Sequence, residues 1–113
     1  MTCYYPLCGG ILTGKYNSGD LPEDSRAVHV LGGKTSCFKK MLNESAKERT
    51  LAKMRALGEI AKELKCSQAQ LALAWCLRNR DVHSVVFGAS KEYQMVDNLN
   101  AFEVLENWTP EVE

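Results

Sequence analysis

Several patterns that would define a class of protein are missing from this sequence. No run of about 18 apolar residues is present, so no transmembrane helix is expected. The first ten residues, MTCYYPLCGG, lack both a basic flank and a long apolar core, so they do not resemble a signal peptide. The formal net charge is +0, which gives no bulk attraction to nucleic acid or to an anionic lipid surface. We therefore expect no nucleic-acid partner and no direct insertion into a membrane.

Metal-binding and acid–base patterns are missing as well. The five cysteines are odd in number and contain no CxxC pair, and the two histidines, His29 and His83, are far apart. This predicts reduced thiols in a cytosolic protein and no metal site. No compact pair of histidine and carboxylate, serine and base, or two carboxylates is visible, so no catalytic residue is assigned. His83 falls inside a predicted strand and is expected to be packed.

What is present is a pattern of short strands and helices in a chain of 113 residues, long enough for one domain. Thr2–Tyr5 is rich in β-forming residues and is stopped by Pro6. Residues 20–45 have no clean period and predict a long loop, in which a short helix around Phe38–Leu42 would fit. From Ala46, apolar residues recur every three or four positions and predict a helix; they are Leu51, Met54, Leu57, Ile60, Ala61 and Leu64.

A second helix is predicted after Ser67, because Ser67 and Gln70 have the spacing of a capping box. It runs to about Arg78 and is apolar on most sides. Val82–Phe87 is then continuously apolar, which is typical of a parallel strand covered on both faces. A third helix is expected after Ser90, with Met95, Val96 and Leu99 facing inward, and Phe102–Glu113 is expected to be a tail.

The order of elements therefore predicts an α/β fold with two parallel strands joined by helices. Two strands do not form a stable sheet alone. The chain is expected to be part of a larger α/β protein or to pair with another chain.

The turn between the second strand and the third helix is the first candidate site. Gly88 permits close approach, and the first N–H groups of a helix lack intrahelical partners and lie at its positive end. An anion, most often a phosphate, is the natural ligand there. The alternative is that Ser90 only caps the helix.

Two further segments could contribute to a site. Leu7–Gly14 has three glycines and is followed by Lys15 and, further on, by Arg26, but Tyr16 after Gly14-Lys15 excludes a P-loop. The alternative is a solvated loop. Gln94, with Asp97 or Asn98, occupies one helix face and could bind a ribose or a base edge. The alternative is an ordinary polar helix face.

Together these segments resemble the C-terminal third of the aldo-keto reductase family. The matching stretches are YYPLCGGILTGKY, the DSR at residues 24–26, CSQAQLALAWCLRN and VHSVVFGASKEYQMVDN. Within the family they are most similar to the beta subunits of voltage-gated potassium channels, where PLxxGxxxGKY, AWCLRN and GAS-x3-Q-x3-N occur in this order. The resemblance implies a partial (β/α)8 TIM barrel, in which residues 1–113 supply the last two strands with their helices.

The resemblance also implies an NADPH site. Tyr4 would lie near the nicotinamide, the Pro6–Gly9 loop and Lys15 near the pyrophosphate, and Asp97 with Asn98 at the adenine. Arg26, Ser90 and Gln94 would hold the adenosine end and its 2′-phosphate. Three positions depart from the family pattern: Tyr5 replaces a serine, Asp24 a tyrosine and Asp97 a glutamate. The full cofactor set carried over by position is Tyr4, Tyr5, Pro6, Leu7, Cys8, Gly9, Lys15, Asp24, Arg26, Gly88, Ser90, Gln94, Asp97 and Asn98.

Two functions are implied. The first is a fragment of a regulatory beta subunit that binds NADPH and modulates channel gating and trafficking. Its partners would be voltage-gated potassium channel alpha subunits and other beta subunits, in a homotetramer. It would be cytoplasmic and peripheral to the plasma membrane through the channel. The alternative is a fragment of an NADP-dependent reductase that reduces aldehydes or ketones by hydride transfer. The family's catalytic residues lie on earlier strands, so none is assigned here.

Overall fold

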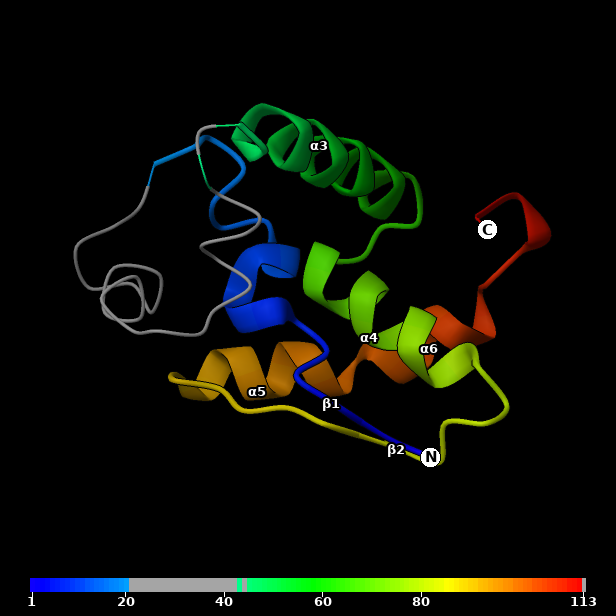
Figure 1. The fold of residues 1–113 in the computed structure, drawn as a ribbon. Helices are drawn as coiled ribbons and strands as arrows, with labels where there is room; N and C mark the ends of the chain where they lie inside the picture. Colours follow the sequence, from blue (N-terminus) through cyan, green and yellow to red (C-terminus); the bar gives the residue numbers. More distant parts are fainter. Residues whose placement is uncertain (21–42, 44, 113) are drawn as a thin grey trace.

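A two-stranded parallel sheet joins the start of the chain to the segment that follows α4, the helix Gln68–Arg78. The computed structural model describes residues 1–20, 43 and 45–112. Strand β1 (Thr2–Tyr4) pairs with β2 (Ser84–Val86) in a register that places Cys3 beside Val85 (Figure 1). The predicted parallel pair is confirmed, although both strands are shorter than predicted. β1 ends before Tyr5 because Tyr5 has a φ of 64°, outside the extended region.

The two long predicted helices are confirmed. Helix α3 (Lys47–Glu63) buries Leu51, Met54 and Ala61 of the predicted stripe. Helix α4 (Gln68–Arg78) begins at the predicted capping box: the Ser67 hydroxyl accepts from the Gln70 N–H at 3.1 Å, and Gln70 Oε1 accepts from the Ser67 N–H at 3.0 Å. The predicted helix at 38–42 lies outside the described residues.

Helix α4 is the centre of the molecule. It lies between α3 and the sheet (Figure 1), and it also packs against the 3-10 helix η1 (Cys8–Thr13) and the helices α5 (Glu92–Leu99) and α6 (Ala101–Glu106). A last 3-10 turn, η2 (Pro110–Val112), follows. The most deeply buried apolar side chains come from η1, the residues after it, and these helices: Ile11, Tyr16, Leu51, Ala61, Leu73, Ala74 and Ala101.

One face of the sheet is open. Cys3 and Val85 face the helices and are half-buried, whereas their strand neighbours Tyr4 and Val86 are 80% and 49% exposed. The prediction that the second strand is covered on both faces is therefore wrong for the described residues. His83, predicted to be packed, is also exposed. Its Nδ1 lies 2.7 Å from the amino group of Met1, because it precedes β2 beside the chain's first residue.

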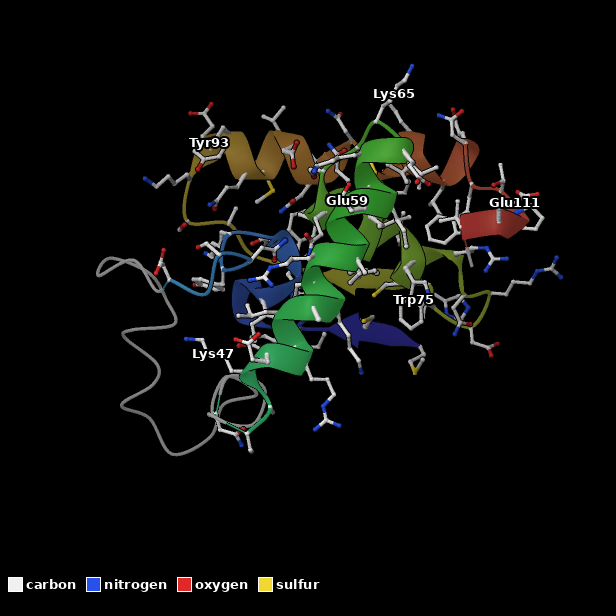
Figure 2. The ribbon with its side chains drawn as sticks, turned by 90° about the horizontal axis from the view of Figure 1, so that it is seen from above. Lys47, Glu59, Lys65, Trp75, Tyr93 and Glu111 are labelled. Atoms are coloured by element: carbon white, nitrogen blue, oxygen red, sulfur yellow. The ribbon has the colours of Figure 1, made fainter. Side chains whose placement is uncertain are left out.

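The third helix, α5, turns toward the core the face that was predicted to face outward. Met95, Val96 and Leu99 are 40–59% exposed, whereas Asn98 is buried. The cause is a polar contact: Asp97 is hydrogen-bonded to the start of α4, which turns the polar face of α5 inward. The tail is also structured, since α6 packs on α4 and buries Ala101 and Val104. Tyr93, on the outer side of α5, lies at the edge of the molecule (Figure 2).

The inward polar face of α5 can be tested by substituting two leucines, one buried and one exposed. Leu73 is 2% exposed and Leu99 is 53% exposed. Leu73→Ala leaves a core cavity and should lower the free energy of unfolding by about 3 kcal/mol. Leu99→Ala, the matched control, should change it by less than about 0.5 kcal/mol. Urea denaturation measures both, and a loss for Leu99→Ala as large as that for Leu73→Ala would contradict the inward polar face.

Candidate functional site

The candidate site lies where the two strands end. Because β1 and β2 are parallel, their carboxyl ends lie at the same edge of the sheet (Figure 1). β1 leads into the segment Tyr5–Lys15, and β2 leads into the turn before α5. The structure thus brings most of the predicted cofactor residues to one edge; Asp24 and Arg26 lie outside the described residues.

The segment after β1 is a tight loop in which several residues have a left-handed backbone. Tyr5, Cys8, Gly9 and Gly10 have φ values of 64°, 48°, 66° and 101°. The φ of 101° at Gly10 favours glycine, and a Cβ atom there would lie 2.6 Å from Cε of Lys15. The Lys15 side chain therefore folds back over the loop, and its Nζ lies 5.2 Å from the centre of the buried Tyr16 ring.

The turn after β2 directs three hydrogen-bond donors at one oxygen. The N–H and hydroxyl of Ser90 each donate to Gln94 Oε1 at 3.1 Å, and the Lys91 N–H donates to the same atom at 3.3 Å. Lys91, not Ser90, occupies the N-cap position of α5. The Ser90 hydroxyl donates to Gln94 Oε1, so it is not a cap acceptor, and a role of Ser90 in binding an anion stays a prediction.

Gly88 and Tyr4 are open to a ligand at this edge. A Cβ atom added to Gly88 would meet no atom within 4 Å. Packing within the described residues therefore gives no reason for glycine at this position. The Tyr4 ring is exposed on the open face of the sheet and stacks on Tyr5, with ring centres 6.1 Å apart and planes at 26°.

Asp97 points away from this edge, toward the start of α4. Its Oδ2 accepts from the Ser67 hydroxyl at 2.8 Å, and its Oδ1 and main-chain oxygen accept from Gln70 Nε2 at 3.0 and 2.8 Å. Burial and the charge of Asp97 together raise the pKa of the Cys66 thiol. Sequence reasoning found the capping box but missed this role, because its third member lies 30 residues away.

Asn98, next to Asp97, is 6% exposed. Its side-chain amide makes no hydrogen bond to another described residue. Among the described residues, the buried side-chain atoms without a hydrogen-bond partner are Asn17 Oδ1 and the indole Nε1 of Trp108, so the Asn98 amide is not an orphaned buried group. The predicted role of Asn98 at an adenine remains a prediction.

An apolar cavity of about 300 Å³ lies between α3, α4 and the C-terminal residues. The Arg78 guanidinium lies 5.6 Å from the centre of the Trp108 ring. Apolar walls do not suit a phosphate, so this cavity is separate in character from the turn at Ser90. Its lining includes Leu57, Ile60, Leu71, Trp75, Cys76 and Trp108.

Two searches of the described residues complete the description. No group of three or more histidine, cysteine, aspartate or glutamate residues within ranges 1–20 and 45–112 is placed to hold a metal ion. No helix in the described part of the chain is both long enough and apolar enough to cross a membrane.

The fold and the site define a parallel α/β unit with a cluster of hydrogen-bond donors at one edge of its sheet, and comparison with known proteins places it in a family. The model of the aldo/keto reductase family matches residues 1–111, so the chain belongs to this family. The chain is 45% identical over 112 residues to a probable voltage-gated potassium channel subunit beta from Oryza sativa subsp. japonica, covering 99% of this chain and 32% of the relative.

Two further relatives have similar names. A probable voltage-gated potassium channel subunit beta from Arabidopsis thaliana is 41% identical over 110 residues, which cover 97% of this chain and 32% of the relative. A putative one from Schizosaccharomyces pombe is 40% identical over 111 residues, which cover 98% and 31%. The chain thus spans about a third of the length of these relatives.

The contact between Ser67 and Asp97 can be measured by a double-mutant cycle. Ser67→Ala and Asp97→Ala each remove hydrogen bonds at the start of α4, and each should lower the free energy of unfolding by about 2 kcal/mol. Because they share one bond, their effects should be less than additive, with a coupling of about 1 kcal/mol. Asp81→Ala, in an exposed turn, is the matched control and should have little effect. Additive effects would show that the two residues act independently.

Proposed function

We propose that this chain is the C-terminal third of a (β/α)8 barrel, residues 1–113, and that it binds the adenosine end of NADPH. In this proposal β1 and β2 are the last two strands of the barrel. The open face of the sheet, with Thr2, Tyr4, Ser84 and Val86, is the face toward the barrel interior. Membership of the aldo/keto reductase family and a helix layer on only one face of the sheet support this assignment.

The convergence of three donors on Gln94 Oε1 is the observation that carries the cofactor proposal. A neutral amide oxygen has two lone pairs, and here it accepts from two N–H groups and one hydroxyl. A phosphate oxygen carries charge and makes stronger hydrogen bonds to the same donors. The positive end of α5 adds to this preference, although Glu92 in the first turn opposes it. The chemistry of the donors therefore fits the 2′-phosphate of NADPH.

The remaining cofactor residues follow from their positions at the same edge. The loop of Pro6, Leu7, Cys8 and Gly9, together with the folded-back Lys15, would border the pyrophosphate. Tyr4 offers an exposed ring near the nicotinamide, with Tyr5 stacked on it. Asn98 would contribute at the adenine with its side-chain amide, and Asp97 mainly by holding α5 against the start of α4. NADPH supplies a hydride from its nicotinamide when bound; the residues of this chain hold and orient the cofactor.

The relatives' names support a regulatory role. They are called potassium channel subunits beta, so we propose that this chain contributes to a cytoplasmic beta subunit that associates with voltage-gated potassium channel alpha subunits. It would modulate their gating and trafficking, assemble as a homotetramer, and reach the plasma membrane only through the channel.

Cofactor selectivity tests the proposed 2′-phosphate contact. The chain should bind NADPH more tightly than NADH, as measured by isothermal titration calorimetry. Ser90→Ala removes a hydroxyl and one charge-assisted bond, and it should weaken NADPH about 10-fold and NADH less than about 2-fold. Ser45→Ala is the control, since Ser45 is exposed and its hydroxyl donates to Asn43 Oδ1, away from the proposed site. Equal weakening for both cofactors would argue against this assignment, and no binding of either would overturn the cofactor proposal.

Gly88→Ala separates binding from folding. The added methyl group meets no protein atom within 4 Å, so the free energy of unfolding should change by less than about 0.5 kcal/mol. If the cofactor lies against the backbone at this turn, the methyl group should weaken NADPH several-fold. Denaturant titration and calorimetry measure the two effects. Unchanged NADPH affinity would show that Gly88 does not contact the cofactor.

A further inference from the structure

Two thiols from distant parts of the sequence meet beneath the sheet. Cys3 is the central residue of β1 and faces the helices, and Cys76 lies near the end of α4. Their Sγ atoms are 3.9 Å apart, although 73 residues separate them in the sequence. The contact therefore links the first strand to the central helix.

The fold holds this pair in place from both sides. Cys3 is fixed by its pairing with Val85 in the parallel sheet. Cys76 follows Leu73 and Ala74, which are 2% and 0% exposed and anchor α4 in the core. Both cysteines are only half-buried, and Cys76 borders the apolar cavity, so a small reagent can reach the pair.

We propose that Cys3 and Cys76 are a redox-sensitive pair that closes to a disulfide and thereby clamps β1 to α4. A contact of 3.9 Å requires the sulfur atoms to approach by roughly 1.9 Å to reach the length of an S–S bond. A small rotation of the two side chains would contribute to this approach. The proposal does not rest on the proposed cofactor.

The oxidant is a small disulfide such as glutathione disulfide. The Cys3 thiolate attacks one sulfur of glutathione disulfide, which breaks its S–S bond and releases one glutathione thiolate. The Cys76 thiolate then attacks Sγ of Cys3 in this mixed disulfide and releases the second glutathione. The protein loses two electrons and two protons, and one glutathione disulfide is reduced to two glutathione molecules.

The environment of Cys76 suits it to the second step. Burial and the neighbouring Cys3 thiol raise the pKa of Cys76 to about 11. Less of Cys76 is therefore thiolate at neutral pH, which makes it the slower attacker of an external disulfide. The attack of Cys76 on the mixed disulfide at Cys3 is intramolecular, so the closeness of the two sulfur atoms compensates for the small fraction of Cys76 that is thiolate.

The test maps the disulfides of the 113-residue chain after equilibration with glutathione disulfide. Alkylation of the remaining thiols, digestion without reductant and mass spectrometry should identify a dominant peptide pair joining Cys3 to Cys76. The same oxidation in guanidinium chloride should give a mixture that includes Cys8, Cys37 and Cys66. If the native and denatured samples give the same mixture, or if Cys3 and Cys76 stay alkylatable, the proposal is overturned.

A thermal melt tests the clamp itself. Closing so long a loop restricts the unfolded chain, so oxidation should raise the unfolding midpoint by at least about 5 °C. Cys76→Ser and Cys3→Ser should each abolish this rise, while Cys66→Ser, the matched control, should retain it. A midpoint that does not rise when the 3–76 link is present would overturn the clamp.

Discussion

The contact of Asp97 with the start of α4 is the interaction on which the arrangement of the site depends. The first N–H groups of a helix need acceptors. At the start of α4 the Ser67 hydroxyl accepts from the Gln70 N–H, and Gln70 Oε1 accepts from the Ser67 N–H. The same two side chains retain a hydroxyl proton and an amide N–H₂, and both are donated to Asp97. One network therefore caps α4 and docks α5. Because the donor cluster at Ser90 belongs to the entry into α5, this network also determines where that cluster lies relative to the end of β2.

Because the Asp97 carboxylate docks α5 on the start of α4, apolar side chains of α5 and α6 are left on the surface. Residues 97, 98, 101 and 104 face inward at helical spacing, so the opposite side of α5 and α6 must face outward. That side carries Tyr93, Val96, Leu99 and Phe102, each 53–67% exposed. Tyr4 and Val86 of the sheet add two more large apolar side chains that are exposed. The chain spans about a third of the relatives' length, and under the proposed barrel both surfaces would be covered by neighbouring elements.

The sequence predicted local features well and their mutual orientation poorly. Periodicity located α3, the capping box located the start of α4, and β-branched composition located β2, because each signal depends on neighbours within a few residues. Local physics also predicts an anion site at the turn Gly88–Ser90, and that role stays a prediction. The inward face of α5 was predicted wrongly because apolar residues were assumed to face the core. The hydrogen bonds of Asp97 outweigh that preference, and their partner lies on another helix. The prediction that His83 is packed was wrong for a related reason, since the strand β2 that follows it is covered on one face only.

The donor cluster at Ser90 also limits how an anion can bind. Its three donors already have an acceptor in Gln94 Oε1, so a phosphate gains only the difference between its own hydrogen bonds and those it replaces. This difference favours the phosphate because its oxygens are charged. The released Gln94 amide then needs new partners, and it can find them in water or on the ligand, since the turn is exposed. Gln94 thus keeps the donors satisfied without a ligand and makes binding an exchange, which lowers absolute affinity but preserves selectivity for a charged oxygen. Under the proposed function, a neutral ribose hydroxyl at the same place would replace one neutral acceptor with another and gain little, and this difference would let the turn distinguish NADPH from NADH.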